Sequence, residues 1–317
     1  MTLAIRPFGA TDADFDGVVA VHNALWPDDP ASVESLRYRE KTRNKERYFV
    51  RLIGELEGRI VASAAGGEAW WSSIPDKYFL GVSVMPEHQR KGFGTRLYDD
   101  VVGRMSERRA ALIETQARED KPEYVRFVTK RGYEQVMRQQ FSKLDVEAFD
   151  DSAFAAFEDR PKELGLEVGT LAEFRERDPD WQRAMWELDT ELMKDVPFPE
   201  PLEQEPFEEY VKHFGHPSFL PEAWFLAKDG DRYVGMSCLW KSLGDPDSIY
   251  TGLTGVRREY RRKGVATSLK VRAIRFAREL GARYVKADNE ENNPMYQLNL
   301  RLGFRPTPAW LMFHKKL

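Results

Sequence analysis

One twelve-residue stretch decides how this chain is organised: Val84-Met85-Pro86-Glu87-His88-Gln89-Arg90-Lys91-Gly92-Phe93-Gly94-Thr95. It recurs 172 residues later, with six identical positions, as Val256-Arg257-Arg258-Glu259-Tyr260-Arg261-Arg262-Lys263-Gly264-Val265-Ala266-Thr267. A second match follows at nearly the same offset, because the Lys-Arg-Gly-Tyr of residues 130–133 resembles the Arg-Leu-Gly-Phe of residues 301–304. These matches indicate a duplicated domain, since a solenoid would repeat every ~20–50 residues.

The duplication predicts an N-terminal domain of residues 1–150 and a C-terminal domain of residues 163–317. The boundary is expected within residues 145–164, where polar residues and Pro161 interrupt the apolar pattern. Residues 153–157 are apolar enough to form a linking helix in place of a flexible tether. The total length of 317 residues agrees with two domains of ordinary size, ~150 residues each.

The composition excludes several classes of protein. The 48 basic and 52 acidic residues give a net charge of −4, which argues against a surface dedicated to nucleic acid. The single cysteine, Cys238, excludes a disulfide framework and a cysteine-based zinc site, and the sparse histidines predict no other metal site. No apolar run reaches the ~18–20 residues of a membrane span, and residues 1–7 lack a signal-peptide core. We therefore expect a cytoplasmic protein without membrane partners, either a monomer or a homodimer.

Each copy shows the same order of elements. Strands are expected at 3–6, 47–53, 59–65 and 77–84 in the first copy, and at 223–228, 233–240, 248–256, 284–287 and 308–314 in the second. Helices are expected at 92–106, 264–280 and 292–302, the second with Leu269, Ala273, Phe276 and Leu280 facing inward. Hairpins followed by strand–helix–strand units predict an α+β fold. Each domain would be a central, mostly antiparallel sheet flanked by helices.

The repeated stretch places a turn of small residues directly between a strand and a helix, at residues 89–94 and 261–266. Free N–H groups and the helix dipole at such a turn suit a pyrophosphate, and glycine lets the backbone approach it closely. The spacing fits neither a P-loop nor a three-glycine dinucleotide fingerprint. Because the turn occurs twice in the same context, we favour phosphate binding over a plain helix-initiating turn.

The chain resembles the GCN5-related N-acetyltransferase (GNAT) superfamily over essentially its whole length, as two tandem domains. The residues that carry this resemblance are the two turns and the stretch 292–304, Asn-Asn-Pro-Met-Tyr-Gln-Leu-Asn-Leu-Arg-Leu-Gly-Phe. That stretch looks like the family element that runs beside the pantetheine of acetyl-CoA. The resemblance implies that acetyl-CoA is the co-substrate and that an amine attacks its thioester directly.

The resemblance also implies which residues bind acetyl-CoA: the strand pairs with the pantetheine amides and the turn holds the pyrophosphate. In the first copy these residues are Val82, Val84, Gln89, Arg90, Lys91, Gly92, Phe93, Gly94 and Thr95. In the second copy they are Thr254, Gly255, Val256, Arg261, Arg262, Lys263, Gly264, Val265, Ala266, Thr267, Asn292 and Asn299.

The second copy has the fuller set of motifs, because Asn292 and Asn299 are seven residues apart and would share one helix face. The first copy has Lys121 and Val128 at the aligned positions. We therefore expect the C-terminal domain to be catalytic. The N-terminal domain would be a degenerate scaffold or an additional cofactor site.

Three residues of the second copy are the catalytic candidates. Many GNAT enzymes have an acidic tyrosine at the position of Asn299, so Tyr296, three residues earlier, is the candidate acid, or else a packed aromatic. Asn299 itself is expected to contact the cofactor. An alkylammonium with a pKa of ~10.4 must lose its proton before it attacks. Asp195, near Glu191, could bind that amine or act through water, or be a solvated surface carboxylate.

The favoured function is acetyl transfer from acetyl-CoA to the amine of a small molecule. Two alternatives stay open. One is acetylation of a protein or peptide, and the other is a non-catalytic scaffold that binds acyl-CoA.

Overall fold

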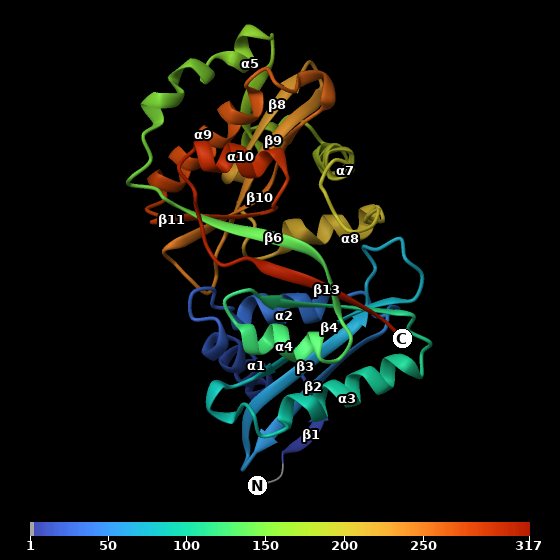
Figure 1. The fold of residues 1–317 in the computed structure, drawn as a ribbon. Coiled ribbons are helices and arrows are strands. Elements are labelled where there is room, and N and C mark those ends of the chain that lie inside the picture. The colour runs from blue at the N-terminus through green and yellow to red at the C-terminus, as the bar shows by residue number, and fades with distance from the viewer. Residues whose placement is uncertain (1–2) are drawn as a thin grey trace. The chain divides into compact units, whose positions relative to one another are not determined.

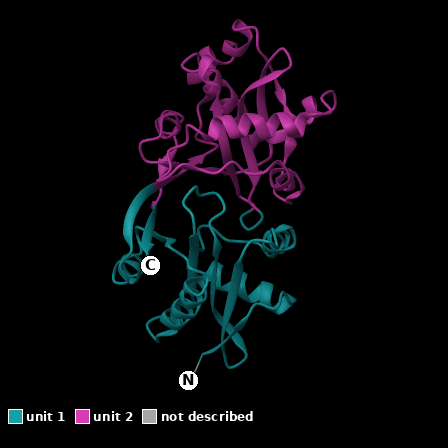
Figure 2. Cartoon of the chain, turned by 90° about the vertical axis from the view of Figure 1, so that its right-hand side faces the viewer, with its two compact units in different colours: residues 1–138, 243–245, 310–317 teal, residues 139–242, 246–309 magenta. Residues whose placement is uncertain are grey.

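The computed structural model describes residues 3–317, which divide into two compact units (Figure 2). The N-terminal unit contains residues up to 138 together with 243–245 and 310–317, and the C-terminal unit contains residues 139–242 and 246–309. Each unit is a mixed sheet with helices packed against it, so the predicted tandem α+β fold is confirmed. Within residues 3–317, no helix combines the length and apolarity needed to cross a membrane.

The N-terminal unit has six strands in the order β1 (Ala4–Pro7), β2 (Phe49–Leu56), β3 (Arg59–Glu68), β4 (Lys77–Val84), β5 (Leu112–Arg118) and β13 (Trp310–Lys316). The neighbours are antiparallel except β4 and β5, which run parallel. Its helices are α1 (Asp12–Leu25), α2 (Val33–Thr42), α3 (Phe93–Ser106) and α4 (Pro122–Thr129) (Figure 1). Helix α3 turns Leu97, Val101 and Met105 fully into the core.

The C-terminal unit repeats this plan. Its strands follow the order β6 (Glu134–Asp145), β11 (Tyr284–Glu290), β10 (Ser248–Val256), β9 (Arg232–Lys241), β8 (Trp224–Asp229) and β7 (Glu167–Thr170), with β12 (Arg305–Pro306) beside β6. Its helices are α5 (Arg160–Glu163), α6 (Leu171–Arg175), α7 (Trp181–Met193), α8 (Phe207–Tyr210), α9 (Val265–Glu279) and α10 (Pro294–Arg301). Leu280, expected to face inward, is 49% exposed because α9 ends at Glu279.

The compact units group the chain differently from the two sequence copies. Strand β13 ends the second copy but belongs to the N-terminal unit, where it pairs with β5 along its whole length. Its Leu311 and Phe313 are buried in the core of that unit. Most of β6, which ends the first copy, belongs to the C-terminal unit. The domain bounds 1–150 and 163–317 therefore stay a prediction about the copies, while each compact unit takes its last strand from the other copy.

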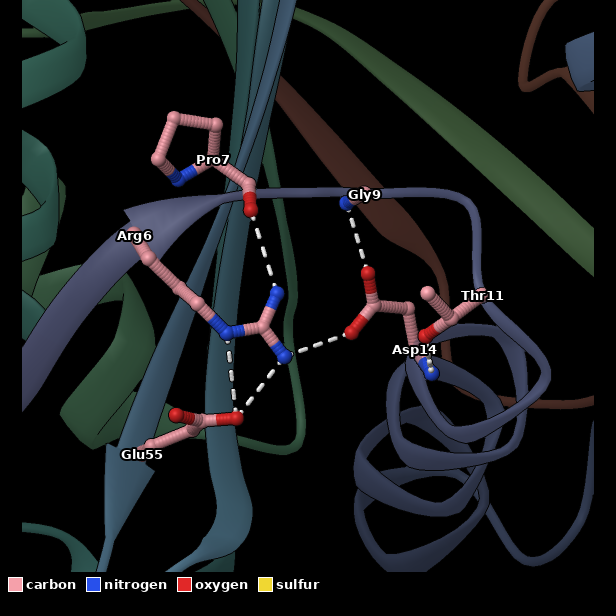
Figure 3. A network of polar contacts seen from close by, with 6 residues as sticks. All are labelled: Arg6, Pro7, Gly9, Thr11, Asp14 and Glu55. Atoms are coloured by element: carbon pink, nitrogen blue, oxygen red, sulfur yellow. Dashed lines mark hydrogen bonds and ion pairs between the residues drawn. The ribbon is translucent and has the colours of Figure 1, made fainter.

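Arg6 on β1 joins three elements of the N-terminal unit (Figure 3). Its Nη2 lies 2.6 Å from Asp14 Oδ1 on α1 and 2.7 Å from Glu55 Oε1 on β2. The second Asp14 oxygen accepts from the Gly9 N–H at 2.6 Å, although the whole Asp14 residue is fully buried. The hydrogen bond from Arg6 holds the pKa of the Asp14 carboxyl below its ordinary value. This buried carboxylate depends on one guanidinium for its neutralisation.

We expect Arg6→Ala to lower the free energy of unfolding by about 3 kcal/mol, because it leaves the Asp14 carboxylate buried without a cation. Urea denaturation of the full chain measures this loss. Arg37→Ala is the control, since its pair with Asp12 is exposed and should contribute less than ~1 kcal/mol. Because the folded pKa of Asp14 is lowered, the stabilisation is complete above pH ~4 and is lost as the pH falls through that lowered pKa. Equal losses for the two variants would contradict the assignment.

Candidate functional site

The sheet of the N-terminal unit opens between β4 and β5. These parallel strands pair only from Lys77 to Phe79, and the side of β4 that faces β5 has no strand partner from Leu80 onward. At the point of separation, the Thr115 hydroxyl donates to the Leu80 carbonyl at 2.8 Å. Beyond it Gly81 is exposed, with no atom within 4 Å of where a Cβ would stand. Unpaired backbone groups in such an opening can pair with the amides of a ligand.

The turn at residues 89–94 stands at the wide end of this opening. The Gln89 side-chain amide donates to the Val84 carbonyl at 2.9 Å and to the Tyr124 hydroxyl at 3.0 Å, which fixes the turn to β4 and α4. Arg90 and Gly92 have left-handed φ values of 61° and 81°. Among residues 3–317, no side chain caps α3 and nothing lies within 4 Å of a Cβ built on Gly92. Within this part of the chain the N-cap of α3 therefore has no side-chain partner, as an anion site requires.

Arg131 lies beside this turn and was not among the predicted site residues. Its Nη2 donates to the hydroxyl of exposed Thr95 at 2.7 Å, and its guanidinium lies 3.6 Å from the ring centre of Phe127. Stacking on Phe127 holds a permanent cation beside the first turn of α3. The available signal was its place in the repeated stretch 130–133, two residues beyond α4.

The C-terminal unit has the same frame. Strands β10 and β11 pair only from Ser248 to Tyr250 before they separate. Arg261 takes the place of Gln89, because its Nε donates to the Val256 carbonyl at 3.1 Å. Arg262 and Gly264 repeat the left-handed conformations, with φ values of 58° and 86°. The duplicated turn thus has one backbone geometry in both units.

The second turn is covered by protein. A Cβ on Gly264 would lie 2.8 Å from Phe157 and 3.2 Å from Arg160, both from the segment that links the copies. In the first turn of α9, Ser268 is only 2% exposed and its hydroxyl donates to the Glu158 carbonyl at 3.4 Å. The linking segment therefore occupies the space over Gly264 that is open over Gly92.

Asp195, a predicted catalytic residue, is the counter-ion of this second turn. Arg258 Nη2 donates to its Oδ1 at 2.6 Å, and Arg261 Nη2 pairs with its other oxygen. These hydrogen bonds lower the pKa of Asp195 to about 2. A carboxylate with so low a pKa is a weak base for an amine. The neighbouring Glu191 pairs with Arg257, so both carboxylates neutralise the basic stretch before Gly264.

The predicted pantetheine-side residues of the C-terminal unit are not brought together as expected. Helix α10 begins at Pro294, so exposed Asn292 lies outside it and its amide donates to Glu290 at 2.8 Å. The prediction that Asn292 and Asn299 share a helix face is therefore wrong. Asn299 is 1% exposed and donates to Asn289 at 2.8 Å, while its Oδ1 is buried without a partner. Tyr296 is half-buried on α10.

The remaining predicted cofactor residues divide by exposure. Exposed or half-buried are Val82, Arg90, Lys91, Gly94, Gly255, Arg262, Lys263, Ala266 and Thr267. Buried in the core are Val84, Phe93, Val256 and Val265, which leaves only their backbone for a ligand. The Thr254 hydroxyl is bonded to Ser237 at 3.0 Å inside the C-terminal unit.

Comparison with protein families identifies one match. The model of the acetyltransferase (GNAT) family matches residues 18–133 and again residues 181–304. These ranges include both openings and both turns.

Known proteins resemble the chain at two levels. A tandem GNAT protein from the clavulanic acid biosynthesis pathway superposes with a TM-score of 0.77 at 18% identity, covering 99% of this chain and 98% of that one. A GCN5-related N-acetyltransferase from Sphaerobacter thermophilus superposes at 0.70 with 19% identity, covering 99% and 97%. In sequence, N-alpha-acetyltransferase 30 of Schizosaccharomyces pombe is 30% identical over 107 residues, which cover 32% of this chain and 68% of that protein.

The two turn glycines should respond differently to alanine. We expect Gly92→Ala to cost about 1 kcal/mol, the price of a left-handed alanine. Gly264→Ala should cost about 1–3 kcal/mol more, because its Cβ would overlap Phe157. Urea unfolding of both variants measures the difference. Equal costs would mean that the segment carrying Phe157 does not pack on the second turn.

Proposed function

We propose that this chain, which belongs to the acetyltransferase (GNAT) family, binds acetyl-CoA in its N-terminal unit and acetylates the amine of a small molecule. Family membership makes the chain an N-acetyltransferase, and the family uses acetyl-CoA as co-substrate. The proposal concerns the unit that carries the reaction and the class of acceptor. The observation that carries it is the open turn at Gly92, compared with the covered turn at Gly264.

Three features of the N-terminal turn support acetyl-CoA binding there. The start of α3 offers free N–H groups, which attract the negative charge of a pyrophosphate. Arg90 and Lys91 are exposed beside it, and Arg131 adds a cation on the α4 side. In the C-terminal unit Arg261, which stands at the position of Gln89, is already paired with Asp195. These contacts favour the N-terminal copy over the sequence-based choice of the C-terminal copy.

The reaction itself requires two proton movements. The acceptor nitrogen forms a bond to the acetyl carbonyl carbon, the carbon–sulfur bond of the thioester breaks, the amine loses a proton and the departing thiolate gains one. Tyr124 is the candidate donor of that last proton, because Gln89 donates to its hydroxyl oxygen and leaves its own O–H free to donate. An edge-to-face contact with Trp26, with 5.8 Å between the ring centres, holds the Tyr124 ring in place.

Tyr124 also takes over a role that the sequence assigned to the other copy. It is the third residue of α4, as Tyr296 is the third residue of α10. In the C-terminal unit the turn residue Arg261 pairs with Asp195, whereas Gln89 contacts Tyr124. In the N-terminal unit the tyrosine is therefore linked to the turn.

A small-molecule acceptor is favoured by the resemblance over the full length to a tandem protein of the clavulanic acid pathway. The second candidate is acetylation of a protein N-terminus, which is supported by the sequence resemblance to the yeast N-alpha-acetyltransferase. That resemblance covers about a third of this chain, which is why we place it second.

Binding is tested by placing charge at the open turn. We expect Thr95→Glu to weaken acetyl-CoA binding at least tenfold, because its carboxylate would repel the pyrophosphate and pair with Arg131. An acidic residue in the first turn of a helix is favourable for folding, so the variant should remain stable. Thr95→Gln is the size-matched control and should change the Kd less than threefold. Isothermal titration decides, and equal Kd values for the two variants would reject the N-terminal site.

The acceptor is tested with a panel read by release of the CoA thiol. We expect turnover with small amines, such as polyamines, amino sugars and amino acids, and none with peptides that carry a free N-terminus. Turnover of peptides alone would select the second candidate.

Tyr124→Phe should lower kcat about a hundredfold while the Kd for acetyl-CoA stays unchanged, because only the proton donor is lost. An unchanged kcat for Tyr124→Phe would remove the proposed acid.

A further inference from the structure

The segment between the copies lies along α9 for the length of that helix (Figure 1). We call residues 146–163 the strap; they include a short 3-10 helix (Asp151–Phe157) and α5. At the far end of α9, Arg278 donates to the carbonyls of Val146 and Phe149 at 3.1 and 2.6 Å. At the near end, Phe157 and Arg160 stand against Gly264. The strap thus runs from the last turn of α9 to the turn that begins it.

Helix α9 has a polar stripe that contacts the strap. Ser268, Arg272, Arg275 and Arg278 follow one another at intervals of three or four residues and therefore lie on one helix face. Arg275 pairs with Asp151 at 2.7 Å and with Glu158 at 3.0 Å, and Arg272 donates to the Glu158 carbonyl at 3.2 Å. Every member of the stripe thus donates a hydrogen bond to the strap, so one whole face of α9 binds it.

The matching face of α3 carries none of these partners. The positions equivalent to the stripe are Arg96, Asp100, Gly103 and Ser106. Asp100 pairs with Arg104 of its own helix, and the Ser106 hydroxyl donates to the Val102 carbonyl of the same helix. The duplication therefore produced two helices with one backbone role, and only α9 has side chains that hold a cover.

The charge of the second turn is also satisfied from within the chain. Asp195 accepts from both Arg258 and Arg261, so its carboxylate already pairs with two of the cations at the second turn. Phe157 covers the glycine at which a pyrophosphate would approach the backbone. The Phe157 ring thus lies where the nucleotide part of acetyl-CoA would approach Gly264, and the Asp195 carboxylate supplies negative charge in its place.

We infer that Phe157 of the strap and Asp195 plug a second acetyl-CoA site in the C-terminal unit, so that each chain binds one acetyl-CoA and gains a second only when the plug is removed. The inference rests on the proposed function, because it takes the N-terminal turn as the site that is open. The stripe ion pairs are partly exposed, with Asp151 and Glu158 side chains 33% and 44% accessible. Exposed pairs contribute little each, so the packing of Phe157 on Gly264 is the contact to remove.

The test counts acetyl-CoA sites per chain by isothermal titration and native mass spectrometry. We expect one site in the wild-type chain and two in the double variant Phe157→Ala with Asp195→Ala. The charge-matched control is Leu164→Ala with Glu259→Ala, which removes one exposed apolar residue and one acidic side chain of the same unit without touching Gly264. The control should keep one site. Circular dichroism and thermal melting establish that each variant is folded.

Two results would overturn the inference. Two sites in the wild-type chain would mean that the second turn is open, and the same number of sites in the wild-type chain and in the folded double variant would mean that the plug is not what closes it. Should the double variant not fold, the single variants Phe157→Ala and Asp195→Ala are titrated in its place. At least one of them should reveal the second site at high acetyl-CoA, and two folded single variants that both keep the wild-type count would also overturn the inference.

Thr95→Glu separates this inference from the proposed function. In that background the N-terminal site is lost, so the double plug variant should retain one site, which is the C-terminal one. If instead the wild-type chain binds none and the plug variant binds one that Thr95→Glu does not affect, the N-terminal assignment fails while the plug stands. If neither chain binds acetyl-CoA, both are rejected.

Discussion

A parallel strand pair that ends after three residues controls the rest of this structure. Strands β4 and β5 separate after Phe79, as β10 and β11 separate after Tyr250. The backbone groups beyond this point are open to water or to the amides of a ligand. The turn and helix that follow each strand stand at the wide end of the opening, where a helix N-terminus offers charge to an anion. Both units share this arrangement of strands, turn and helix.

The two units differ in what satisfies the turn. At the first turn, Gln89 hydrogen-bonds to β4 and to Tyr124. In the described part of the chain, no atom lies within 4 Å of a Cβ built on Gly92 of that turn. At the second turn, Arg261 also binds its strand, through Nε and the Val256 carbonyl, and in addition donates from Nη2 to Asp195. Because an arginine has more donors than a glutamine, it can hold the strand and recruit a carboxylate at once. Two differences in the repeat, Arg258 for Pro86 and Arg261 for Gln89, thus accompany the change from an open to an internally neutralised turn.

The fold was largely predictable from particular residues. The repeat at 84–95 and 256–267 predicted the duplicated domain, and Leu269 and Ala273 predicted the buried face of α9. The exchange of last strands was not predictable, because the apolar run 310–313 does not indicate which of the two sheets its strand will join. At the site, the seven-residue spacing of Asn292 and Asn299 misled, since Pro294 starts α10 after Asn292. Arg131 was overlooked because its contact to Thr95 joins residues 36 apart.

The sequence by itself determined the duplication, the strand–turn–helix unit and the acetyltransferase family, because these depend on local spacing, glycine positions and residue type. Only the tertiary structure decided which turn is open. The two turns have the same backbone, and what distinguishes them is Phe157 and Asp195, which lie 107 and 66 residues before their partners Gly264 and Arg261. A local pattern records how a turn is shaped, whereas the occupant of that turn is set by packing and charge contacts between residues far apart in the chain.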